Sequence, residues 1–240
     1  MQKFFVSSLS DKVMIEGDNF RHISKSLRMK EGDAITLCDG RGTDGFGHIE
    51  EIGTSSLVVA IDKKERSVSE PKTNVGLFVG WPKGDKTDLI VQKAVEIGAS
   101  SVTFLMSEFC VSRPKSSEYE KKISRLQKIA LEAATQSGRG IIPEIKGILP
   151  LKDALKEMLT YEKPFMLYEG ECPSMRKSLE DKKASYALLT GPEGGFSKDE
   201  VELCKNMGIL PVSLGKRILR CETAPLTALS ALLFYVGDMD

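Results

Sequence analysis

The stretch 188-LLTGPEGGFSKDE-200 decides the fold class of this chain. It begins with an apolar run, passes through a turn that contains three glycines and a proline, and ends in a polar segment that suits a helix. Ser197 is predicted to cap a helix that starts at Lys198. A second stretch, 213-SLGKRILRCETAPLTALSALLF-234, also combines a short apolar strand, a tight loop and a helix. Such repeated units predict an α/β domain.

The same alternation extends toward the N-terminus, back to Val75. Asp85, with Asp88 three residues later, is predicted to open one helix, and Gly138 to end another. Alternating strands and helices predict a mostly parallel sheet that is covered on both faces and binds ligands at the carboxyl ends of its strands. The predicted strands are 75–81, 101–106 and 164–169, and the predicted helices are 85–97, 119–137 and 151–159.

The first seventy residues have a different pattern, with short, partly alternating runs at 33–40, 46–53 and 56–64. These runs predict strands, and a small barrel is the natural way to hide the edges of so few. A short helix is expected over 18–28, capped by Asp18 or Asn19. The charged, proline-containing segment 63–74 is predicted to separate two domains, which span 1–70 and 74–240.

Composition excludes several classes of protein. The 240 residues include 34 basic and 34 acidic side chains, so any site for a polyanion must be a local patch. The N-terminus lacks the apolar run of a signal peptide, and 224–236 is too short to cross a bilayer and is predicted to be a buried helix. With two histidines and no C-x-x-C pair, we expect no metal site, no disulfide framework and a cytoplasmic location. The five scattered cysteines are Cys38, Cys110, Cys172, Cys204 and Cys221.

The first loop offers main-chain groups rather than reactive side chains. Gly191, Gly194 and Gly195 allow a ligand to approach the backbone closely. A tight turn without any ligand remains an equal alternative. A phosphate site is less favoured, because the loop has neither the Lys-Ser/Thr pair of a P-loop nor a suitably spaced acidic residue for a ribose.

The second loop concentrates charge beside an almost uncharged helix. Lys216, Arg217 and Arg220 lie close to Glu222, and Thr223 is predicted to cap the helix. This arrangement suits a polar ligand, although solvated surface charge is the alternative. Cys221 is a candidate nucleophile, since a helix start and a neighbouring arginine depress the pKa of a thiol. However, no histidine lies nearby in the sequence to activate it.

These motifs, together with 81-WPKGDKTDLIVQKAVEIGA-99 and 107-SEFCVSR-113, resemble the bacterial family that methylates N3 of a uridine in 16S ribosomal RNA, within the SPOUT class. The segment 32-GDAITLCDGRG-42 resembles the PUA-like N-terminal barrel of that family. The resemblance covers nearly the whole chain. Pro225 departs from it, because the family more often has a small residue there.

The resemblance implies a mostly parallel sheet tied in a trefoil knot, an N-terminal PUA-like barrel and a homodimer in which each subunit completes the other's site. It also implies that S-adenosylmethionine binds, bent, between the two loops, with main-chain groups reading adenine and ribose. The residues that would surround it are Leu189, Thr190, Gly191, Gly194, Gly195, Ser213, Leu214, Gly215, Ile218, Leu219 and Thr223.

For the chemistry, uracil N3 is an imide that is largely protonated at neutral pH. We hypothesise that Arg220 stabilises the charge that develops on the base, and that Glu222 accepts the proton or orients the base. The alternative is that the two side chains simply pair with each other.

For the RNA, Arg21, Lys25 and Arg28 would form one basic stripe on a helix. His22 would stack on or hydrogen-bond to the RNA, and the alternative is that it fills the rim of the barrel. A solvated helix face is the alternative to phosphate contacts. The expected partner is 16S ribosomal RNA within assembled small subunits, without any membrane. Further candidates for RNA contacts in the second domain are Lys83, Lys86, Lys93, Arg113 and Arg139.

Two other functions stay open. One is a ribose 2′-O-methyltransferase of the same class, although its usual last motif has Asn where this chain has Gly215. The other is a non-catalytic RNA-binding module with a degenerate pocket.

Overall fold

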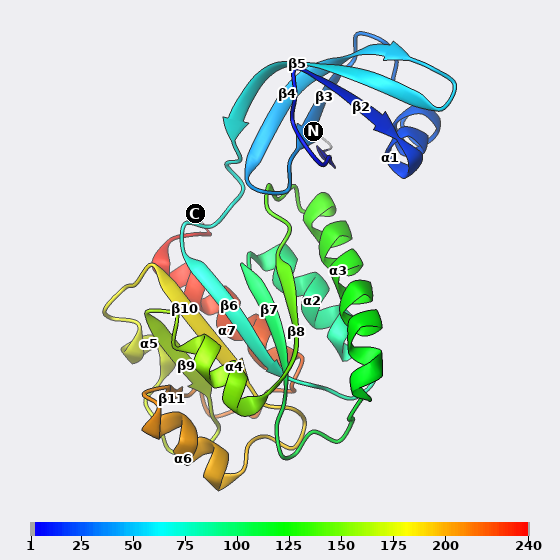
Figure 1. The fold of residues 1–240 in the computed structure, drawn as a ribbon. Coiled ribbons are helices and arrows are strands. Elements are labelled where there is room, and N and C mark those ends of the chain that lie inside the picture. The colour runs from blue at the N-terminus through cyan, green and yellow to red at the C-terminus, as the bar shows by residue number, and fades with distance from the viewer. Residues whose placement is uncertain (1–2, 240) are drawn as a thin grey trace. The chain divides into compact units, whose positions relative to one another are not determined.

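The computed structural model describes residues 3–239, which form two compact units (Figure 1). The first unit runs to Glu70 and also includes Ala134–Ile142. The second contains Pro71–Ala133 and the chain from Pro143 onward. The sequence pattern did not predict that residues 134–142 join the first unit.

The first unit contains a curled five-stranded sheet with the order β1-β3-β4-β5-β2. β1 and β3 are parallel and the other pairs are antiparallel. The sequence predicted β3, β4 and β5 but missed the short strands β1 and β2. β5 also continues into the segment predicted as a linker. The strands are β1 Lys3–Phe5, β2 Lys12–Glu16, β3 Ala34–Cys38, β4 Thr43–Ile52 and β5 Ser56–Arg66.

The helix of this unit starts earlier than predicted. α1 (Gly17–Arg21) follows β2 directly, and a π-helical turn, η1 (His22–Ser26), continues it. The extended residue before the helix is Glu16, and no side chain caps it. Asn19 instead donates from Nδ2 to the Phe5 carbonyl (3.0 Å). The predicted cap at Asp18 or Asn19 is therefore wrong, because both residues already lie inside the helix.

The second unit is built on a six-stranded sheet with the order β11-β9-β10-β6-β7-β8. Every pairing in it is parallel, which confirms the predicted mostly parallel sheet. β8 was not predicted. The strands are β6 Asn74–Gly80, β7 Ser101–Met106, β8 Glu144–Pro150, β9 Lys163–Leu167, β10 Ser185–Thr190 and β11 Leu210–Val212.

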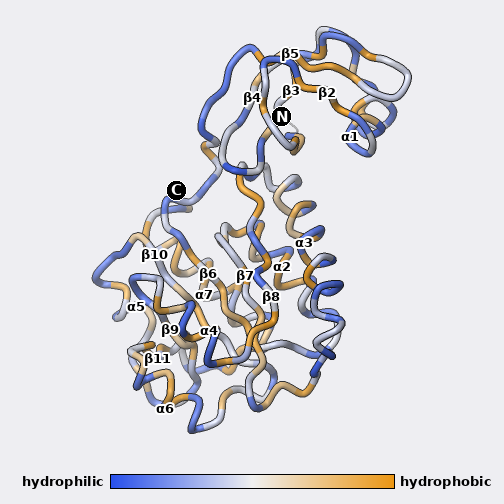
Figure 2. Tube along the Cα trace, in the orientation of Figure 1, coloured by the Kyte–Doolittle hydropathy of each residue, from blue (hydrophilic) through white to orange (hydrophobic). Residues whose placement is uncertain are grey.

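Helices cover both faces of this sheet. α4 and α6 share one core with Phe78, Met166 and Leu189, whereas α7 contacts β6, β10 and α2 on the other face (Figure 1). The tube of α3 alternates between hydrophobic and hydrophilic colours in Figure 2, as its predicted apolar stripe requires. The helices are α2 Lys86–Ile97, α3 Tyr119–Gln136 after the 3₁₀ turn η2 Ser116–Glu118, α4 Leu151–Met158, α5 Met175–Ser178, α6 Lys198–Asn206 and α7 Thr223–Val236.

The predicted helix caps had different outcomes. Ser197 caps α6 as predicted: its side chain accepts from the Glu200 N–H, and the Glu200 side chain accepts from the Ser197 N–H. Asp85 is the N-cap residue of α2, as predicted, but its side chain makes no capping hydrogen bond. The cap predicted at Thr223 is wrong, because Thr223 is already the first residue of α7.

Within residues 3–239, no helix is long and apolar enough to cross a membrane. α7 buries Ala228, Leu229, Leu232 and Leu233, but it leaves the Phe234 side chain 72% exposed. The predicted buried helix is thus buried on one face only.

Candidate functional site

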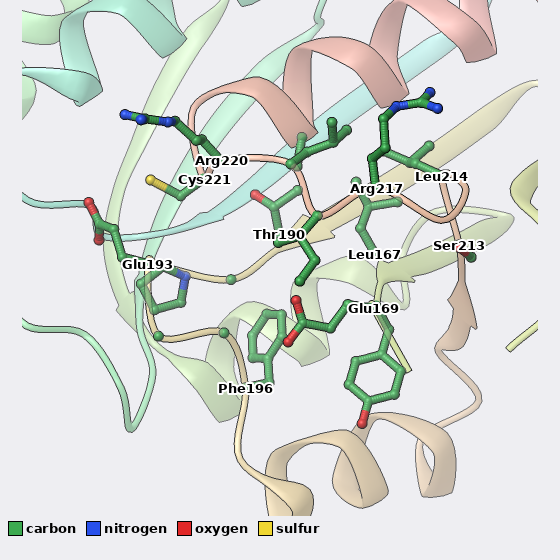
Figure 3. A pocket seen from close by; sticks show the side chains of 18 of the residues that line it. Leu167, Glu169, Thr190, Glu193, Phe196, Ser213, Leu214, Arg217, Arg220 and Cys221 are labelled. Atoms are coloured by element: carbon green, nitrogen blue, oxygen red, sulfur yellow. The ribbon is translucent and has the colours of Figure 1, made fainter. Parts of the chain in front are cut away.

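A cleft of about 590 Å³ lies in the second unit, at the carboxyl ends of β9, β10 and β11. This volume is within the usual range for small-molecule sites. Three segments line the cleft, residues 167–169, 190–196 and 213–221, together with Lys86 and Ala224. Figure 3 shows the loop after β11 facing the ends of β9 and β10 across the cavity. The two loops singled out in the sequence therefore enclose one cavity.

The loop after β10 needs its glycines. A Cβ on Gly194 would approach the Phe109 Cβ to 2.7 Å, and one on Gly191 would lie 3.1 Å from the Gly195 Cα. Gly195 has φ +69°, and its N–H donates to the Pro192 carbonyl (3.0 Å), which closes the turn. The glycines thus permit a tight turn whose backbone borders the cavity.

Thr190 supplies a polar group to this wall. Its side chain lines the cleft and is 1% exposed, and its Oγ1 has no hydrogen-bond partner among residues 3–239. A buried hydroxyl without a partner costs free energy. A polar ligand in the cleft would satisfy it.

The loop after β11 is fixed at its start and apolar further on. The Ser213 N–H donates to the Pro173 carbonyl and the Met175 N–H donates to the Ser213 carbonyl (both 2.9 Å). Gly215 has φ +114°. Beyond it Ile218, a cleft-lining residue, leaves its side chain 81% exposed. An apolar side chain so exposed at a cavity is suited to covering an apolar ligand group.

The charges at one end of the cleft are organised around Lys86. Its Nζ donates to Glu193 Oε1 (2.9 Å) and lies 3.2 Å from Glu222 Oε2. Burial alone would raise the pKa of Glu193, but hydrogen bonds from Lys86 and from the Lys83 N–H lower it to about 2. The pKa of Glu222 is also lowered, since bonds from its own backbone, Cys221 and Lys86 outweigh burial. Both carboxyl groups are therefore ionised at neutral pH.

Arg220 does not pair with Glu222. Within the described chain, no hydrogen bond or ion pair holds its guanidinium, whereas Glu222 is bound to Lys86. Arg220 and Cys221 lie at the end of the cleft that carries Glu193, opposite Ser213 and Leu214 (Figure 3). The alternative in which the two predicted catalytic residues neutralise each other is wrong.

The prediction that Cys221 could act as a nucleophile is also wrong. The Cys221 side chain is buried, and burial together with the hydrogen bond to Glu222 raises its pKa to about 12, although Lys86 opposes this. The thiol therefore stays protonated at neutral pH and is a poor nucleophile.

Most residues predicted to surround a cofactor line the cleft. Leu189 and Thr223 do not: Leu189 is fully buried in the core shared with α4 and α6, and Thr223 begins α7. Glu222 also lies outside the lining, but its carboxylate contacts two lining residues, Lys86 and Cys221. The predicted residues found in the lining are Thr190, Gly191, Gly194, Gly195, Ser213, Leu214, Gly215, Ile218 and Leu219.

Sequence reasoning missed one wall of the cleft. Leu167, Tyr168 and Glu169 line it from the end of β9, and Phe196 lines it from the loop after β10. The predicted strand 164–169 carried a usable signal, because the carboxyl ends of parallel strands lie at one edge of a sheet. Only the strand order shows that β9 lies between β10 and β11.

The basic stripe predicted in the first unit is not continuous. Arg21 lies in α1 and is paired with Asp18, Lys25 lies in the π-helical turn, and Arg28 follows it with φ +55°. The predicted spacing assumed one α-helix, which is wrong here. His22 lies beside Phe4, with 5.9 Å between the ring centroids.

Two of the residues predicted to contact RNA, Arg139 and Lys86, have other roles in the structure. Arg139 is 4% exposed and pairs with Glu70 in the first unit, so the prediction that it contacts RNA is wrong. Lys86 is held by two glutamates at the cleft. The remaining candidates in the second unit are Lys83, Lys93 and Arg113.

Known families match both parts of the chain. An RNA methyltransferase domain matches residues 69–233, and an RNA methyltransferase PUA domain matches residues 15–62. The ribosomal RNA small subunit methyltransferase E of Bacillus subtilis is 30% identical, covering 98% of this chain and 96% of the relative. The enzyme of the same name from Buchnera aphidicola of Schizaphis graminum is 31% identical, covering 99% and 96%.

Solved structures agree. A ribosomal RNA small subunit methyltransferase E from Neisseria gonorrhoeae, bound to S-adenosylmethionine, has a TM-score of 0.86 at 28% identity over 98% of both chains. A methyltransferase from Legionella pneumophila in complex with the same cofactor has a TM-score of 0.85 at 28% identity over 97% of both chains. These similarities confirm the resemblance drawn from the motifs and the α/β SPOUT-class fold with a PUA domain. The chain belongs to the ribosomal RNA small subunit methyltransferase E family.

Proposed function

We propose that this protein is an S-adenosylmethionine-dependent methyltransferase that acts on N3 of a uridine in 16S ribosomal RNA. Near-full-length similarity to enzymes named for methylating small-subunit ribosomal RNA supports the substrate class. The observation that carries the proposal is the cleft, in which two glycine-containing loops face each other at the ends of parallel strands. The choice of N3 rests on the motifs of the family that the sequence resembles.

The cleft fits this cofactor. The unpartnered Thr190 hydroxyl and the backbone around Gly191, Gly194 and Gly195 suit the polar edges of adenine and ribose. Ile218 and Leu219 offer an apolar wall to the flat ring. Bound S-adenosylmethionine supplies an activated methyl group, and the chain supplies alignment and electrostatics.

The roles of the charged residues follow from their partners. Arg220 has no ion pair among the described residues, so its guanidinium is available to stabilise negative charge on uracil O2 or O4. The lowered pKa of Glu222 makes it a weak proton acceptor. We therefore assign Glu222 the orienting role rather than that of the base.

We further propose that the first unit binds the RNA through Arg21, Lys25 and Arg28, and that Lys83, Lys93 and Arg113 extend this contact. The division of labour is then RNA binding by residues 1–70 and methyl transfer by 74–240. A trefoil knot, a homodimer with a shared site and a location in the cytoplasm, where ribosomal RNA resides, complete the proposal.

The test is transfer of a labelled methyl group to small ribosomal subunits that lack base methylation, followed by mass spectrometry of the digested RNA. We expect a methyl group on N3 of one uridine. A methyl group on a ribose would favour the 2′-O-methyltransferase, and binding of S-adenosylmethionine without any transfer would favour the non-catalytic module. Because the net charge is zero, protein-free 16S RNA is expected to be a poorer substrate than assembled subunits.

A further inference from the structure

We propose that Lys86 is a positioning residue that holds the two cleft loops together, by pairing with a glutamate on each side. The inference deepens the proposed function and rests on it in treating the cleft as the site of the methyl donor. The sequence predicts Lys86 as an RNA contact, and no local pattern marks it for this role.

Lys86 contacts two segments that are far away in the sequence. It is the first residue of α2, and its Nζ donates to Glu193 Oε1 (2.9 Å), in the loop after β10. The same atom lies 3.2 Å from Glu222 Oε2 and donates to Cys221 Sγ (3.4 Å), where the loop after β11 ends. One ammonium group therefore bridges the two loops that enclose the cleft.

Both glutamate contacts are reinforced locally. Glu193 Oε1 also accepts from the Lys83 N–H (3.1 Å), and Cys221 Sγ donates to Glu222 Oε2 (3.2 Å). The side chains of Lys86, Glu193 and Glu222 are 30%, 29% and 17% exposed, so water screens the group only in part. A screened surface pair contributes little, but this cluster is partly shielded and has several bonds.

Charge balance explains why the cation matters. Glu193 and Glu222 both keep lowered pKa values in the presence of Lys86, whose own pKa is raised chiefly by the hydrogen bond that it donates to Glu193. Without the ammonium, two carboxylates would face each other and favour separation of the loops. Lys86 thus stabilises the closed form of the cleft without touching the reacting atoms.

The first experiment measures hydrogen exchange of the backbone amides in the full-length protein without cofactor. In Lys86→Met, amides of 190–196 and of 213–222 should exchange at least about tenfold faster, because local opening becomes easier. Lys86→Arg, which keeps the charge, should restore most of the protection. The matched control is Lys156→Met, which removes an exposed lysine of α4 that pairs with Asp153, one turn away on the same helix. Unchanged exchange in both loops of Lys86→Met would overturn the proposal.

The second experiment measures cofactor affinity by calorimetry and kinetics. Lys86→Met and Glu193→Gln should each weaken S-adenosylmethionine binding about tenfold, raising its KM more than they lower kcat. The double variant should be little worse than either single variant, because both act on one contact. Additive losses would contradict the bridge.

The two proposals fail in different ways. If the wild type binds no S-adenosylmethionine while Lys86→Met still loosens both loops, the proposed function is wrong and the bridge stands. If the wild type methylates ribosomal RNA and Lys86→Met matches it in exchange, affinity and KM, the bridge is wrong and the function stands.

Discussion

At the scale of single residues, the cleft combines a lysine that is ion-paired with two glutamates and an arginine that has no ion pair among the described residues. Lys86 is bound by Glu193 and Glu222, whereas the Arg220 guanidinium has no ion pair within residues 3–239. The difference separates a residue that shapes the cleft from one that can meet a substrate. The sequence placed Lys216, Arg217, Arg220 and Glu222 in one cluster and could not separate them.

Arg220→Ala should lower kcat by about 100-fold, as expected when a donor that stabilises developing charge is removed. The dissociation constant for S-adenosylmethionine, measured by calorimetry, should change by less than about threefold. Arg176→Ala, which removes an exposed arginine of α5 outside the cleft lining, is the control and should leave both quantities unchanged. Turnover of Arg220→Ala at the wild-type rate would remove Arg220 from the mechanism.

Glu193 should make the stability of the protein sensitive to acid. Its pKa is about 2 in the folded protein and 4.5 as the reference for the unfolded chain. A depressed pKa stabilises the fold fully above the unfolded value, and this contribution is lost as pH falls from about 4.5 toward 2. The gap in unfolding free energy between wild type and Glu193→Gln should therefore be constant above pH 6 and shrink below 4.5.

Urea unfolding at several pH values between 7 and 3.5 measures this gap. Glu171→Gln, an exposed glutamate beyond β9, corrects for the general effect of one fewer acidic group. A gap that stays the same over the whole range would show that Lys86 does not hold the Glu193 carboxylate.

At the scale of elements, local patterns predicted helices better than their caps. Ser197 caps α6 because its side chain reaches the Glu200 N–H, and the buried Glu200 carboxylate also accepts from the Glu108 N–H (2.7 Å). Thr223 has a capping side chain as well but lies one residue inside α7. Residue type alone therefore does not identify a cap. The side chain must belong to the residue directly before the first helical residue, which is Ser197 for α6 but Glu222 for α7.

Ser197→Ala should lower the free energy of unfolding by about 1 kcal/mol, because it removes one of the acceptors that satisfy the first turn. Thr223→Ala should change it by less than about 0.5 kcal/mol, because no cap is lost. Chemical denaturation compares the two variants directly. Equal losses in the two variants would mean that the Ser197 hydroxyl contributes no more to stability than the Thr223 hydroxyl, which caps nothing.

At the scale of the whole molecule, residues 134–142 belong to the first unit although their sequence neighbours belong to the second. Glu70 holds this segment: it accepts from Arg139 Nη2 (2.5 Å), the Gly140 N–H (2.8 Å) and the Ile141 N–H (3.0 Å). Burial would raise the pKa of Glu70, but these bonds lower it. The buried arginine is thus part of the architecture.

Arg139→Met should destabilise the protein by about 3 kcal/mol, because it leaves the partly buried Glu70 carboxylate without its cation. Arg66→Met, at the exposed end of β5, is the matched control and should cost less than about 0.5 kcal/mol. Denaturant unfolding measures both. If Arg139→Met instead kept wild-type stability but lost RNA binding, Arg139 would be an RNA contact and not a structural partner of Glu70.

The sequence by itself determined the parallel α/β sheet, the cap at Ser197 and the glycine-rich loop from Gly191 to Gly195, because each depends on residues that are close in the chain. Only the tertiary structure decided that β9 supplies a wall of the cleft, that Lys86 meets Glu193 across 107 positions and that Arg139 meets Glu70 across 69. Periodicity and turn chemistry report local backbone preferences. Pairing between distant side chains depends on strand order and helix placement, which local preferences leave open.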